Sequence, residues 1–574
     1  MWKLRDYLKP FLPTAFMVMV LVFLEVMATL RLPDLMSEIV DQGIAQGNIA
    51  LIWRTGGIML AVALGGVLCA ILGTFLASRA ATGFGRDLRQ AVFTKVEEFA
   101  PQEFNNFGTA SLITRTTNDV QQMQQMFLIS MRMAMRAPLM AIGGVLMVVK
   151  KDAQLALVLL ALIPVLALVV GIVIRKGIPL FKSLQQKLDR LNQVLREQLM
   201  GVRVIRAFDR GAYEQERFKE ANLDLTTTTL RVNRIMVTMG PLMGLLTNFV
   251  TIAIIWMGAK RIDAGLMQVG DMMAFLQYTM QILWSLMMLS MLFVMLPRAS
   301  ASADRIMEVL ETVPSIKDPE QPQTVSNGPG VVEFENVTFS YPGADAPVLS
   351  DLSFTARPGE MTAIIGGTGS GKTTVLDLVP RFYDPQSGRI TLDGVDIRNL
   401  TQADLRSRLG YVPQQAVLFS GTIGSNIRGG KQDATDEEVA EAARVAQATE
   451  FIEERAEAYD SYIAQGGTNV SGGQKQRLSI ARAVVRRPQV YLLDDTFSAL
   501  DYKTDARLRT ELAKISQDAT VIVVAQRVST ILHADQIIVL ENGKVVGRGT
   551  HDELVASCKV YQEIVASQYG EEAV

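Results

Sequence analysis

The 574-residue sequence contains only two cysteines and two histidines, which excludes whole classes of protein. Cys69 lies in an apolar run and Cys558 near the other end of the chain, so neither a disulfide framework nor a cysteine–histidine metal cluster can be assembled. The formal net charge is −2, so no general attraction to nucleic acid is expected. What the sequence has in excess is apolar residues, which make up 49% of it.

Most of this apolar excess lies in the first half of the chain, in segments of about 20 residues or more that can each cross a hydrocarbon core of about 30 Å as a helix. The N-terminal stretch MWKLRDYLKPF carries basic residues but no small-residue cleavage site follows, so it is interpreted as a helix on the membrane surface rather than a signal peptide. The sequence therefore predicts a multi-pass membrane protein with six spans, near 12–32, 55–78, 127–149, 153–175, 235–259 and 272–297.

The charges between the spans predict the orientation. Residues 34–51 carry only acidic charge, whereas 79–95 and 176–217 hold many lysines and arginines. By the positive-inside rule, the N-terminus and the C-terminal half are expected in the cytoplasm, with the spans in the plasma (inner) membrane. The two long basic connections are helical in pattern and are predicted to project inward, with loop tips near 112–119 and 207–214.

The composition changes after the last span. Residues 311–330 are rich in proline, glutamine, serine and asparagine, which is typical of a linker. We therefore predict a transmembrane domain over 1–310 and a second domain over 331–568.

A glycine-rich segment of the second domain, GGTGSGKT at 366–373, matches the phosphate-binding pattern G-x-x-x-x-G-K-[ST]. A strand is expected over 361–365 and a helix over 373–379, which is the context this pattern requires. The glycines let the backbone wrap a phosphate, Lys372 reaches the β- and γ-phosphates, and the Thr373 hydroxyl can bind Mg²⁺. The predicted ATP-binding residues here are Gly366, Gly367, Thr368, Gly369, Ser370, Gly371, Lys372, Thr373 and Thr374.

A second motif-bearing stretch spans residues 470–501. Its serine and glycines can expose backbone N–H groups at the start of a helix, where phosphate binds favourably. The strand expected over 490–493 is apolar throughout, as a strand buried on both faces must be. It delivers Asp494 and Asp495 to its carboxyl end, where open α/β sheets bind ligands and where a carboxylate suits Mg²⁺. The residues of the glycine turn are Val470, Ser471, Gly472, Gly473 and Gln474.

The phosphate loop, the SGGQ turn and the LLDD strand together resemble the ATP-binding cassette (ABC) proteins over the whole C-terminal half. LITRTTNDV and GVRVIRAFDR in the basic connections extend the resemblance to type IV, multidrug-exporter-like half-transporters. The fold this implies is an α-helical six-span transmembrane domain fused to an α/β P-loop NTPase. The resemblance further implies that Tyr341 stacks on adenine, that Gln414 touches Mg²⁺, and that 498–501 forms the D-loop.

In that family, two nucleotide-binding domains pair head to tail, and each ATP lies between the phosphate loop of one and the SGGQ signature of the other. Residues 470–474 would therefore serve the ATP of a partner. Because this chain has one set of motifs, the second nucleotide-binding domain is expected on another chain.

Two positions depart from the family pattern. Asp495 stands where members place the glutamate that polarises the attacking water, and its carboxylate is pulled back by about 1 Å, a misplacement that can cost about 10²-fold in rate. Gln526 stands where members keep a histidine that contacts the γ-phosphate, and glutamine cannot take a positive charge. Both changes weaken one ATP site, so we predict a degenerate subunit paired with a non-identical chain that has a competent glutamate.

The function predicted from the sequence is ATP-driven export of drugs or other amphipathic compounds. Two alternatives stay open: a lipid or lipopeptide flippase of the same architecture, and an ATP-sensing regulatory subunit of another membrane protein. Glu25 lies inside the first span and Arg132 and Arg136 in the third. Such charges either contact substrate or form structural ion pairs in the bundle, and the sequence leaves both interpretations open.

Overall fold

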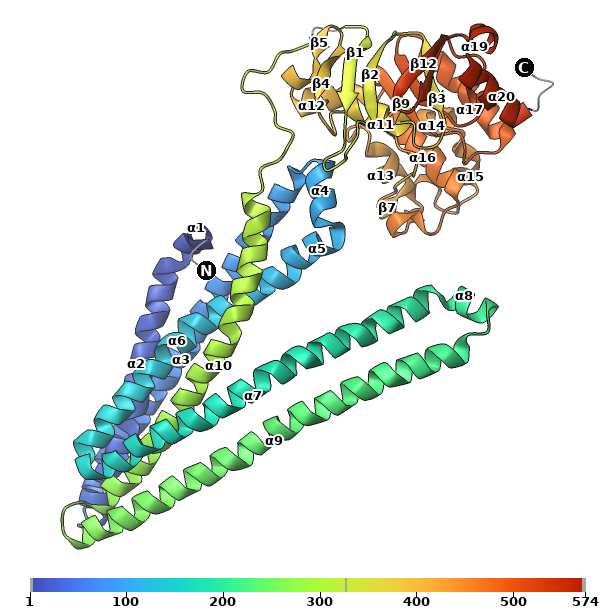
Figure 1. The fold of residues 1–574 in the computed structure, drawn as a ribbon. Helices are drawn as coiled ribbons and strands as arrows, with labels where there is room; N and C mark the ends of the chain where they lie inside the picture. The colour runs from blue at the N-terminus through green and yellow to red at the C-terminus, as the bar shows by residue number, and fades with distance from the viewer. Residues whose placement is uncertain (1–3, 326–327, 570–574) are drawn as a thin grey trace. The chain divides into compact units, whose positions relative to one another are not determined.

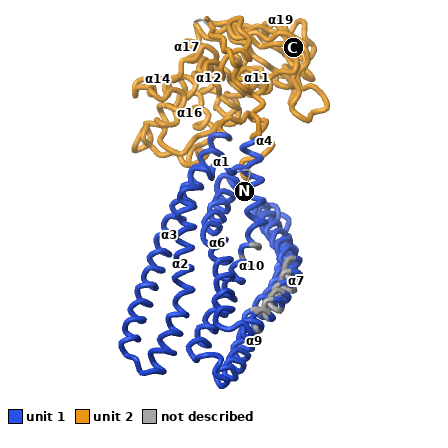
Figure 2. Tube along the Cα trace, turned by 90° about the vertical axis from the view of Figure 1, so that its left-hand side faces the viewer, with its two compact units in different colours: residues 1–95, 112–311 blue, residues 96–111, 312–574 orange. Residues whose placement is uncertain are grey.

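The computed structural model describes residues 4–325 and 328–569, except for side chains at 239 and at several positions within 158–178 and 290–294. The chain divides into two compact units (Figures 1 and 2). Unit 1 comprises Met1–Lys95 and Leu112–Glu311, and unit 2 comprises Val96–Ser111 and Thr312–Val574.

The described residues of unit 1 form helices and the turns that join them, as the long apolar segments predict. The long helices α7 and α9 form a hairpin joined by the short helix α8, and α6 lies beside α10 (Figure 1). The π-helical turns Ile39–Ile44 and Arg115–Asp119 extend α2 and precede α6. The helices are α1 (Arg5–Leu8), α2 (Leu12–Glu38), α3 (Ile49–Glu97), α5 (Thr109–Thr114), α6 (Val120–Lys151), α7 (Ala153–Met200), α8 (Val202–Ala207), α9 (Gly211–Asp263) and α10 (Val269–Glu311).

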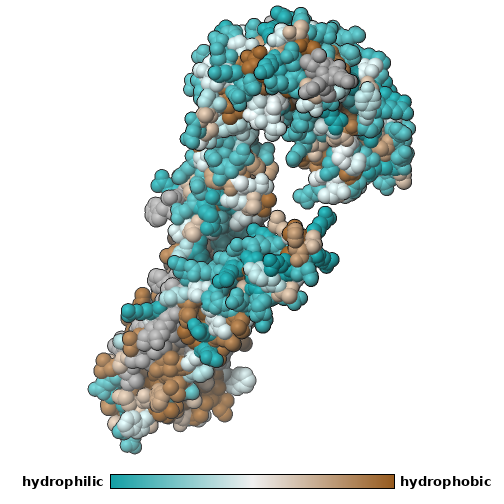
Figure 3. All heavy atoms as spheres, turned by 45° about the vertical axis from the view of Figure 1, so that its right-hand side comes forward, coloured by the Kyte–Doolittle hydropathy of each residue, from teal (hydrophilic) through white to brown (hydrophobic). Residues whose placement is uncertain are grey.

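Within the described residues, five helical stretches are long and apolar enough to cross a membrane. They contain the predicted first, second, third and fifth spans and most of the sixth. The predicted fourth span lies in α7, where many side chains are outside the described set. Large apolar side chains such as Trp53, Leu64 and Phe249 are exposed, and Figure 3 shows hydrophobic residues gathered over one end of the helical unit. Such a surface fits a membrane protein. The five stretches are Arg5–Ile44, Ile49–Glu97, Thr109–Lys151, Gly211–Asp263 and Val269–Leu289.

Ion pairs join the helices of unit 1 at both ends of α6. At its C-terminal end, Lys151 Nζ lies 2.9 Å from Asp34 Oδ1 on α2 and 2.7 Å from Asp271 Oδ1 on α10. Before its N-terminal end, the buried Asp119 pairs with Arg305 of α10. These contacts link segments far apart in sequence, so they stabilise the arrangement of α2, α6 and α10 rather than any single helix.

The connection between the predicted second and third spans turns earlier than the sequence predicts. Residues 112–119 are helical, and the chain instead reverses around α4 (Pro101–Phe107), which ends at Gly108 with a φ of 74°. A positive φ is accessible to glycine without steric cost, so Gly108 can break the helix there. In the second connection, the chain turns between α8 and α9 within the predicted 207–214.

The segment containing α4 packs with unit 2 rather than with the membrane helices. Glu103 Oε1 accepts a hydrogen bond from the Ser315 backbone N–H at 3.2 Å, which ties α4 to the start of the predicted linker. The linker itself lies between the end of α10 at Glu311 and the first strand at Val332, and its residues 326–327 are outside the described set. Residues 96–111 therefore belong to unit 2, although they lie inside the transmembrane domain predicted over 1–310.

Unit 2 contains two principal sheets. A four-stranded antiparallel sheet has the order β2 (Leu349–Ala356), β1 (Val332–Phe339), β4 (Ser387–Leu392), β5 (Val395–Asp396). A six-stranded sheet has the order β12 (Lys544–Gly549), β11 (Gln536–Glu541), β3 (Met361–Gly366), β10 (Thr520–Val524), β9 (Val490–Asp494), β6 (Leu409–Val412), and only β12 runs antiparallel. A short ribbon pairs β7 (Gly421–Thr422) with β8 (Tyr462–Ile463).

The central strands of the six-stranded sheet are fully buried, which explains their apolar sequences. Every residue of β9 and of β10 is buried. Parallel pairing places the carboxyl ends of β3, β9 and β10 at one edge of the sheet. The helices of unit 2 are α4, α11 (Lys372–Leu378), α12 (Gln402–Ser407), α13 (Ile423–Arg428), α14 (Asp436–Val445), α15 (Thr449–Glu453), α16 (Gly472–Val484), α17 (Tyr502–Ile515), α18 (Val528–Ile531), α19 (His551–Ser557) and α20 (Lys559–Tyr569).

Candidate functional site

The phosphate loop connects β3 to α11, as predicted, and its backbone depends on glycine. Gly369 and Gly371 have φ angles of 81° and 96°, which side chains disfavour. A Cβ on Gly366 would lie 2.1 Å from the Leu540 carbonyl oxygen, and one on Gly371 would lie 2.7 Å from Leu349 Cδ2. These glycines therefore permit both the turn and the close packing of the loop against Leu540 and Leu349.

Lys372 holds the loop together at its C-terminal end. Its Nζ donates hydrogen bonds to the carbonyl oxygens of Gly366 at 3.0 Å and Gly367 at 2.7 Å. Burial lowers the pKa of Lys372, opposed by the charges of Asp494 and Asp495. The two hydrogen bonds place the Lys372 Nζ at the loop, where it can meet the phosphates of ATP.

The two strongest candidate Mg²⁺ ligands lie next to each other. Thr373 Oγ1 donates to Asp494 Oδ1 at 3.3 Å, and only 2% of Asp494 is exposed. Burial raises the pKa of Asp494, and the neighbouring Asp495 charge acts in the same direction. A buried carboxylate beside a hydroxyl fits a hard cation, which would offset the cost of burying the charge.

A cavity of about 590 Å³ joins these groups to residues from distant parts of the chain. Every predicted ATP ligand lines it except Ser370, which is a buried residue of the phosphate loop. The cavity also contains both departures from the family pattern. Its polar lining outside the phosphate loop consists of Tyr341, Gln414, Asp494, Asp495, Gln526, Ser567 and Gln568.

Tyr341 is held by contacts on two sides. Its hydroxyl lies 3.0 Å from Thr374 Oγ1, and its ring packs edge-on against Phe339 and Tyr383, with centroid distances of 5.0 and 5.3 Å. The ring is therefore pre-positioned at the cavity, as stacking on a base requires.

Asp495 follows β9 in an uncommon conformation. Its φ is 44°, and its N–H donates to the Val524 carbonyl oxygen at 3.0 Å. Its carboxylate accepts from Gln414 Nε2 at 3.5 Å, the limit of a hydrogen bond. Burial raises the pKa of Asp495. Gln414 thus lies within reach of Asp495, one of the two residues that depart from the family pattern.

The turn at 470–474 does not line the cavity. Ser471 caps α16: Gln474 N–H donates to Ser471 Oγ at 3.3 Å, and Gln474 Oε1 accepts from Ser471 N–H at 3.0 Å. Ser471 and Gly472 are exposed. The structure thus separates this turn from the chain's own ATP cavity and leaves it on the surface.

Gln568 is a cavity residue that the sequence does not reveal. It lies on α20, and its Nε2 donates to the Gln526 carbonyl oxygen at 2.8 Å while its Oε1 accepts from Val528 N–H at 2.8 Å. The Gln568 side-chain amide thereby links the backbone of Gln526 to that of Val528, two residues further along the same loop. An isolated glutamine near the chain end offers no local pattern from which this contact could be predicted.

We expect Gln568→Ala to loosen this loop and weaken ATP binding several-fold. Both bridging hydrogen bonds are lost, each contributing about 1 kcal/mol. Hydrogen exchange at the Val528 amide should accelerate, and ATP affinity can be measured with a fluorescent analogue. Gln562→Ala is the matched control, since that α20 amide donates to the Val555 carbonyl oxygen instead. Equal exchange at Val528 in both variants would contradict the bridging role.

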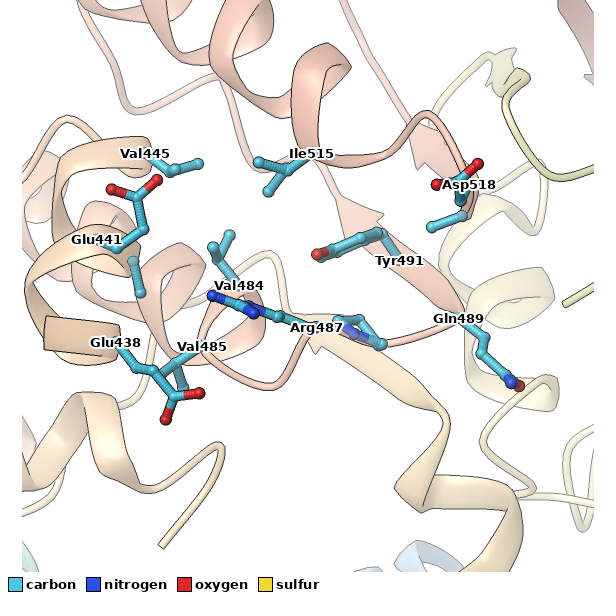
Figure 4. Close-up of a pocket in the computed structure, with 13 residues that line it drawn as sticks. Glu438, Glu441, Val445, Val484, Val485, Arg487, Gln489, Tyr491, Ile515 and Asp518 are labelled. Atoms are coloured by element: carbon cyan, nitrogen blue, oxygen red, sulfur yellow. The ribbon is translucent and has the colours of Figure 1, made fainter. Parts of the chain in front are cut away.

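Unit 2 has a second cavity, of about 430 Å³ (Figure 4). Glu441, Arg487 and Tyr491 line it, and burial raises the pKa of Tyr491 to about 12. Its lining, drawn from the described part of the chain, includes none of the predicted ATP ligands. Tyr491 belongs to β9 and precedes Asp494 by three residues, so this cavity flanks the other end of the same strand.

In unit 1, Glu25 forms an ion pair and also lines a cavity. Its Oε1 lies 2.9 Å from Arg136 Nη1, and only 6% of the residue is exposed. Glu25, Arg132 and Arg136 line one cavity of about 240 Å³. The two interpretations left open by the sequence are therefore compatible, because one pair can serve the bundle and border a binding space.

Glu25→Gln should lower the melting temperature of the purified protein. It leaves Arg136 without its partner in a largely apolar setting, and breaking a buried pair typically costs about 3–5 kcal/mol. Arg136→Gln should be similarly harmful, and the double variant should recover part of the loss because no charge is left unpaired. Additive losses in the double variant would show that the pair contributes no coupling energy.

Comparisons with known proteins cover both units. Residues 15–286 match the family described as the ABC transporter transmembrane region, and residues 349–498 match the family described as ABC transporter. An uncharacterised ABC transporter ATP-binding protein of Mycobacterium tuberculosis is 45% identical over 569 residues, 98% of this chain and 97% of the relative. YfiB of Bacillus subtilis, another uncharacterised ABC transporter ATP-binding protein, is 39% identical over 100% of this chain and 99% of its own.

Two further matches carry more specific descriptions. A fatty acid ABC transporter ATP-binding/permease protein of Mycobacterium tuberculosis is 35% identical over 478 residues, which is 83% of this chain and 75% of the relative. The solved structure of a bacterial Atm1-family ABC exporter with ATP bound aligns over 100% of this chain and 99% of its own, with a TM-score of 0.80 and 25% identity.

Proposed function

Because the chain belongs to the ABC transporter family and joins its membrane and ATP-binding regions in one exporter-like polypeptide, we propose that it is the degenerate-site half of a heterodimeric exporter. The family membership itself implies ATP binding and hydrolysis coupled to transport by a multi-pass membrane protein. The proposal adds that this chain's own site hydrolyses slowly and that its partner is a different half-transporter.

The observation that carries the proposal is the presence of Asp495 and Gln526 at the same cavity as Lys372 and Asp494. The groups that bind phosphate and Mg²⁺ are retained, whereas the two groups that would activate water and contact the γ-phosphate are altered. Thr373, Asp494 and Gln414 would hold Mg²⁺, which would neutralise phosphate charge. Such a site binds ATP but provides a poorly placed base.

A non-identical partner would restore turnover. The exposed turn at 470–474 is available to the ATP of a second chain, and that site would combine this signature with the partner's glutamate and histidine. ATP binding would close the two nucleotide-binding domains in the cytoplasm and turn the bundle outward, and hydrolysis at the competent site would reset it. A homodimer would have two weakened sites.

The transported compound is proposed to be amphipathic. The exposed apolar surface of unit 1 gives access to membrane lipid, and the relative described as a fatty acid transporter supports a lipid-like cargo. Multidrug export and lipid or lipopeptide flipping both require an amphipathic compound, so the surface alone does not distinguish them. Substrate-stimulated ATPase activity and transport in vesicles, measured with each class of compound, distinguish the two.

Affinity purification of the tagged chain from its native membrane tests the proposal. We expect a second, non-identical half-transporter with a catalytic glutamate to co-purify, and the pair to hydrolyse ATP at least about tenfold faster than this chain alone. Full turnover by this chain alone would contradict the proposal. ATP binding without turnover in the purified pair would favour the regulatory alternative.

A further inference from the structure

We propose that the cavity shared by α2, α6 and α10 in unit 1 binds the carboxylate headgroup of an anionic amphiphile. Glu25 comes from α2, and Arg132 and Arg136 come from α6. The remaining walls are apolar and consist of Val22, Leu128, Ile129, Met133 and Met288.

The cavity carries an excess of positive charge. Two guanidinium groups and one carboxylate line it, and the carboxylate of Glu25 is already paired with Arg136 at 2.9 Å. Within the described part of the chain, Arg132 makes no ion pair or hydrogen bond. Arg132 also lies one turn before Arg136 on the same helix, where like charges repel each other.

This imbalance favours an anion over a cation. An uncompensated guanidinium in an apolar span is costly, and an incoming carboxylate would offset that cost. Arginine also recognises carboxylates through paired, charge-assisted hydrogen bonds, which fixes the orientation of the headgroup. The Glu25 carboxylate alone would suggest a cationic substrate, but its pairing with Arg136 removes that attraction.

The apolar walls suit the hydrocarbon part of the same ligand. Five apolar side chains surround the three charged groups, and two of them are methionines, which adapt to ligands of different shape. An amphiphile could therefore place its headgroup at Arg132 and its chain along the surrounding apolar surface. The alternative without a ligand is that Arg132 packs its methylene groups against the cavity wall and keeps its guanidinium group hydrated.

The test is equilibrium binding to the full-length chain in neutral phosphatidylcholine nanodiscs, without nucleotide and at pH 8. Radiolabelled dodecanoate, dodecylamine and dodecanol share one chain length and differ only in their headgroups. We expect dodecanoate to bind most tightly. Arg132→Gln should weaken dodecanoate binding about tenfold or more while leaving dodecanol unchanged, since hydrogen bonds to charged groups contribute about 1.5–3 kcal/mol.

Two further variants make the result decisive. Arg132→Lys keeps the charge and should retain the preference for dodecanoate over dodecylamine. Lys150→Gln removes an exposed cation from the same helix, outside the cavity, and should have no effect. If the three compounds bind equally to the wild-type protein, or if Arg132→Gln matches Lys150→Gln, the proposal is overturned. If Arg132→Gln does not fold, the relative affinities of the three compounds for the wild-type protein test the proposal by themselves.

The binding site is inferred independently of the proposed export function. Only the step from binding to transport of the amphiphile rests on that function. Binding is measured without ATP and without the partner. A symmetric pair of ATP sites would therefore refute the heterodimer and leave the binding result standing. Failure of the binding test would likewise leave the heterodimer proposal standing.

Discussion

Asp495→Asn should leave most of the ATP turnover of the paired complex intact, whereas replacing the partner's catalytic glutamate by glutamine should nearly abolish it. The partner's carboxylate is expected to be the only well-placed base, and loss of a general base costs about 10²–10⁴-fold. Asp495 borders the cavity but is one methylene shorter and accepts a hydrogen bond from Gln414. ATPase assays on the purified pair, with one carboxylate neutralised at a time, measure the difference.

Two further variants locate the productive site. Ser471→Ala should impair turnover, because its exposed hydroxyl is expected to face the partner's ATP. Asp495→Glu should restore this chain's own site only in part, since Gln526 still replaces the histidine. If Asp495→Asn reduced turnover as strongly as the change in the partner, the asymmetric mechanism would be refuted.

Lys372→Ala should weaken ATP binding at this chain's own site by about 10²-fold. The substitution removes an ammonium that lies against the carbonyl oxygens of Gly366 and Gly367, and a charge-assisted contact with phosphate contributes about 1.5–3 kcal/mol. Titration of the isolated chain with a fluorescent ATP analogue reports the affinity of this site.

Lys431→Ala provides the matched control for that titration. It removes a lysine of the same unit whose Nζ pairs with Glu438 at 2.8 Å, away from the ATP cavity. Its affinity for the analogue should equal that of the wild type. Unchanged affinity in Lys372→Ala as well would show that the glycine-rich loop is not the nucleotide site.

Much of the ATP site follows from the sequence because its parts are local. The strand over 361–366 and the helix from Lys372 form where the apolar run ends and the glycines permit positive φ. The burial of β9 likewise follows from its unbroken apolar run, and the position of Asp494 follows from the end of that strand. The membrane spans are similarly local, since length and hydropathy alone predict them.

The turn between the predicted second and third spans shows the limit of such patterns. The sequence placed its tip at 112–119, whereas the helix through those residues is broken earlier, at Gly108. Helical periodicity continues across both places, so periodicity could not choose between them. The hydrogen bond between Glu103 and Ser315 depends on residues 212 positions apart and lies beyond any local pattern.

The sequence by itself determined the long apolar helices, the buried strands β3 and β9 and the glycine-rich loop, because short-range sterics and hydrophobicity decide those. Only the tertiary structure decided which side chains meet. It paired Glu25 with Arg136 and left Arg132 unpaired in the described chain, it brought Gln568 against the Gln526 loop, and it held Gln414 near Asp495. These contacts join residues distant in sequence, and their geometry follows from the packing of whole helices and sheets, which a linear pattern does not encode.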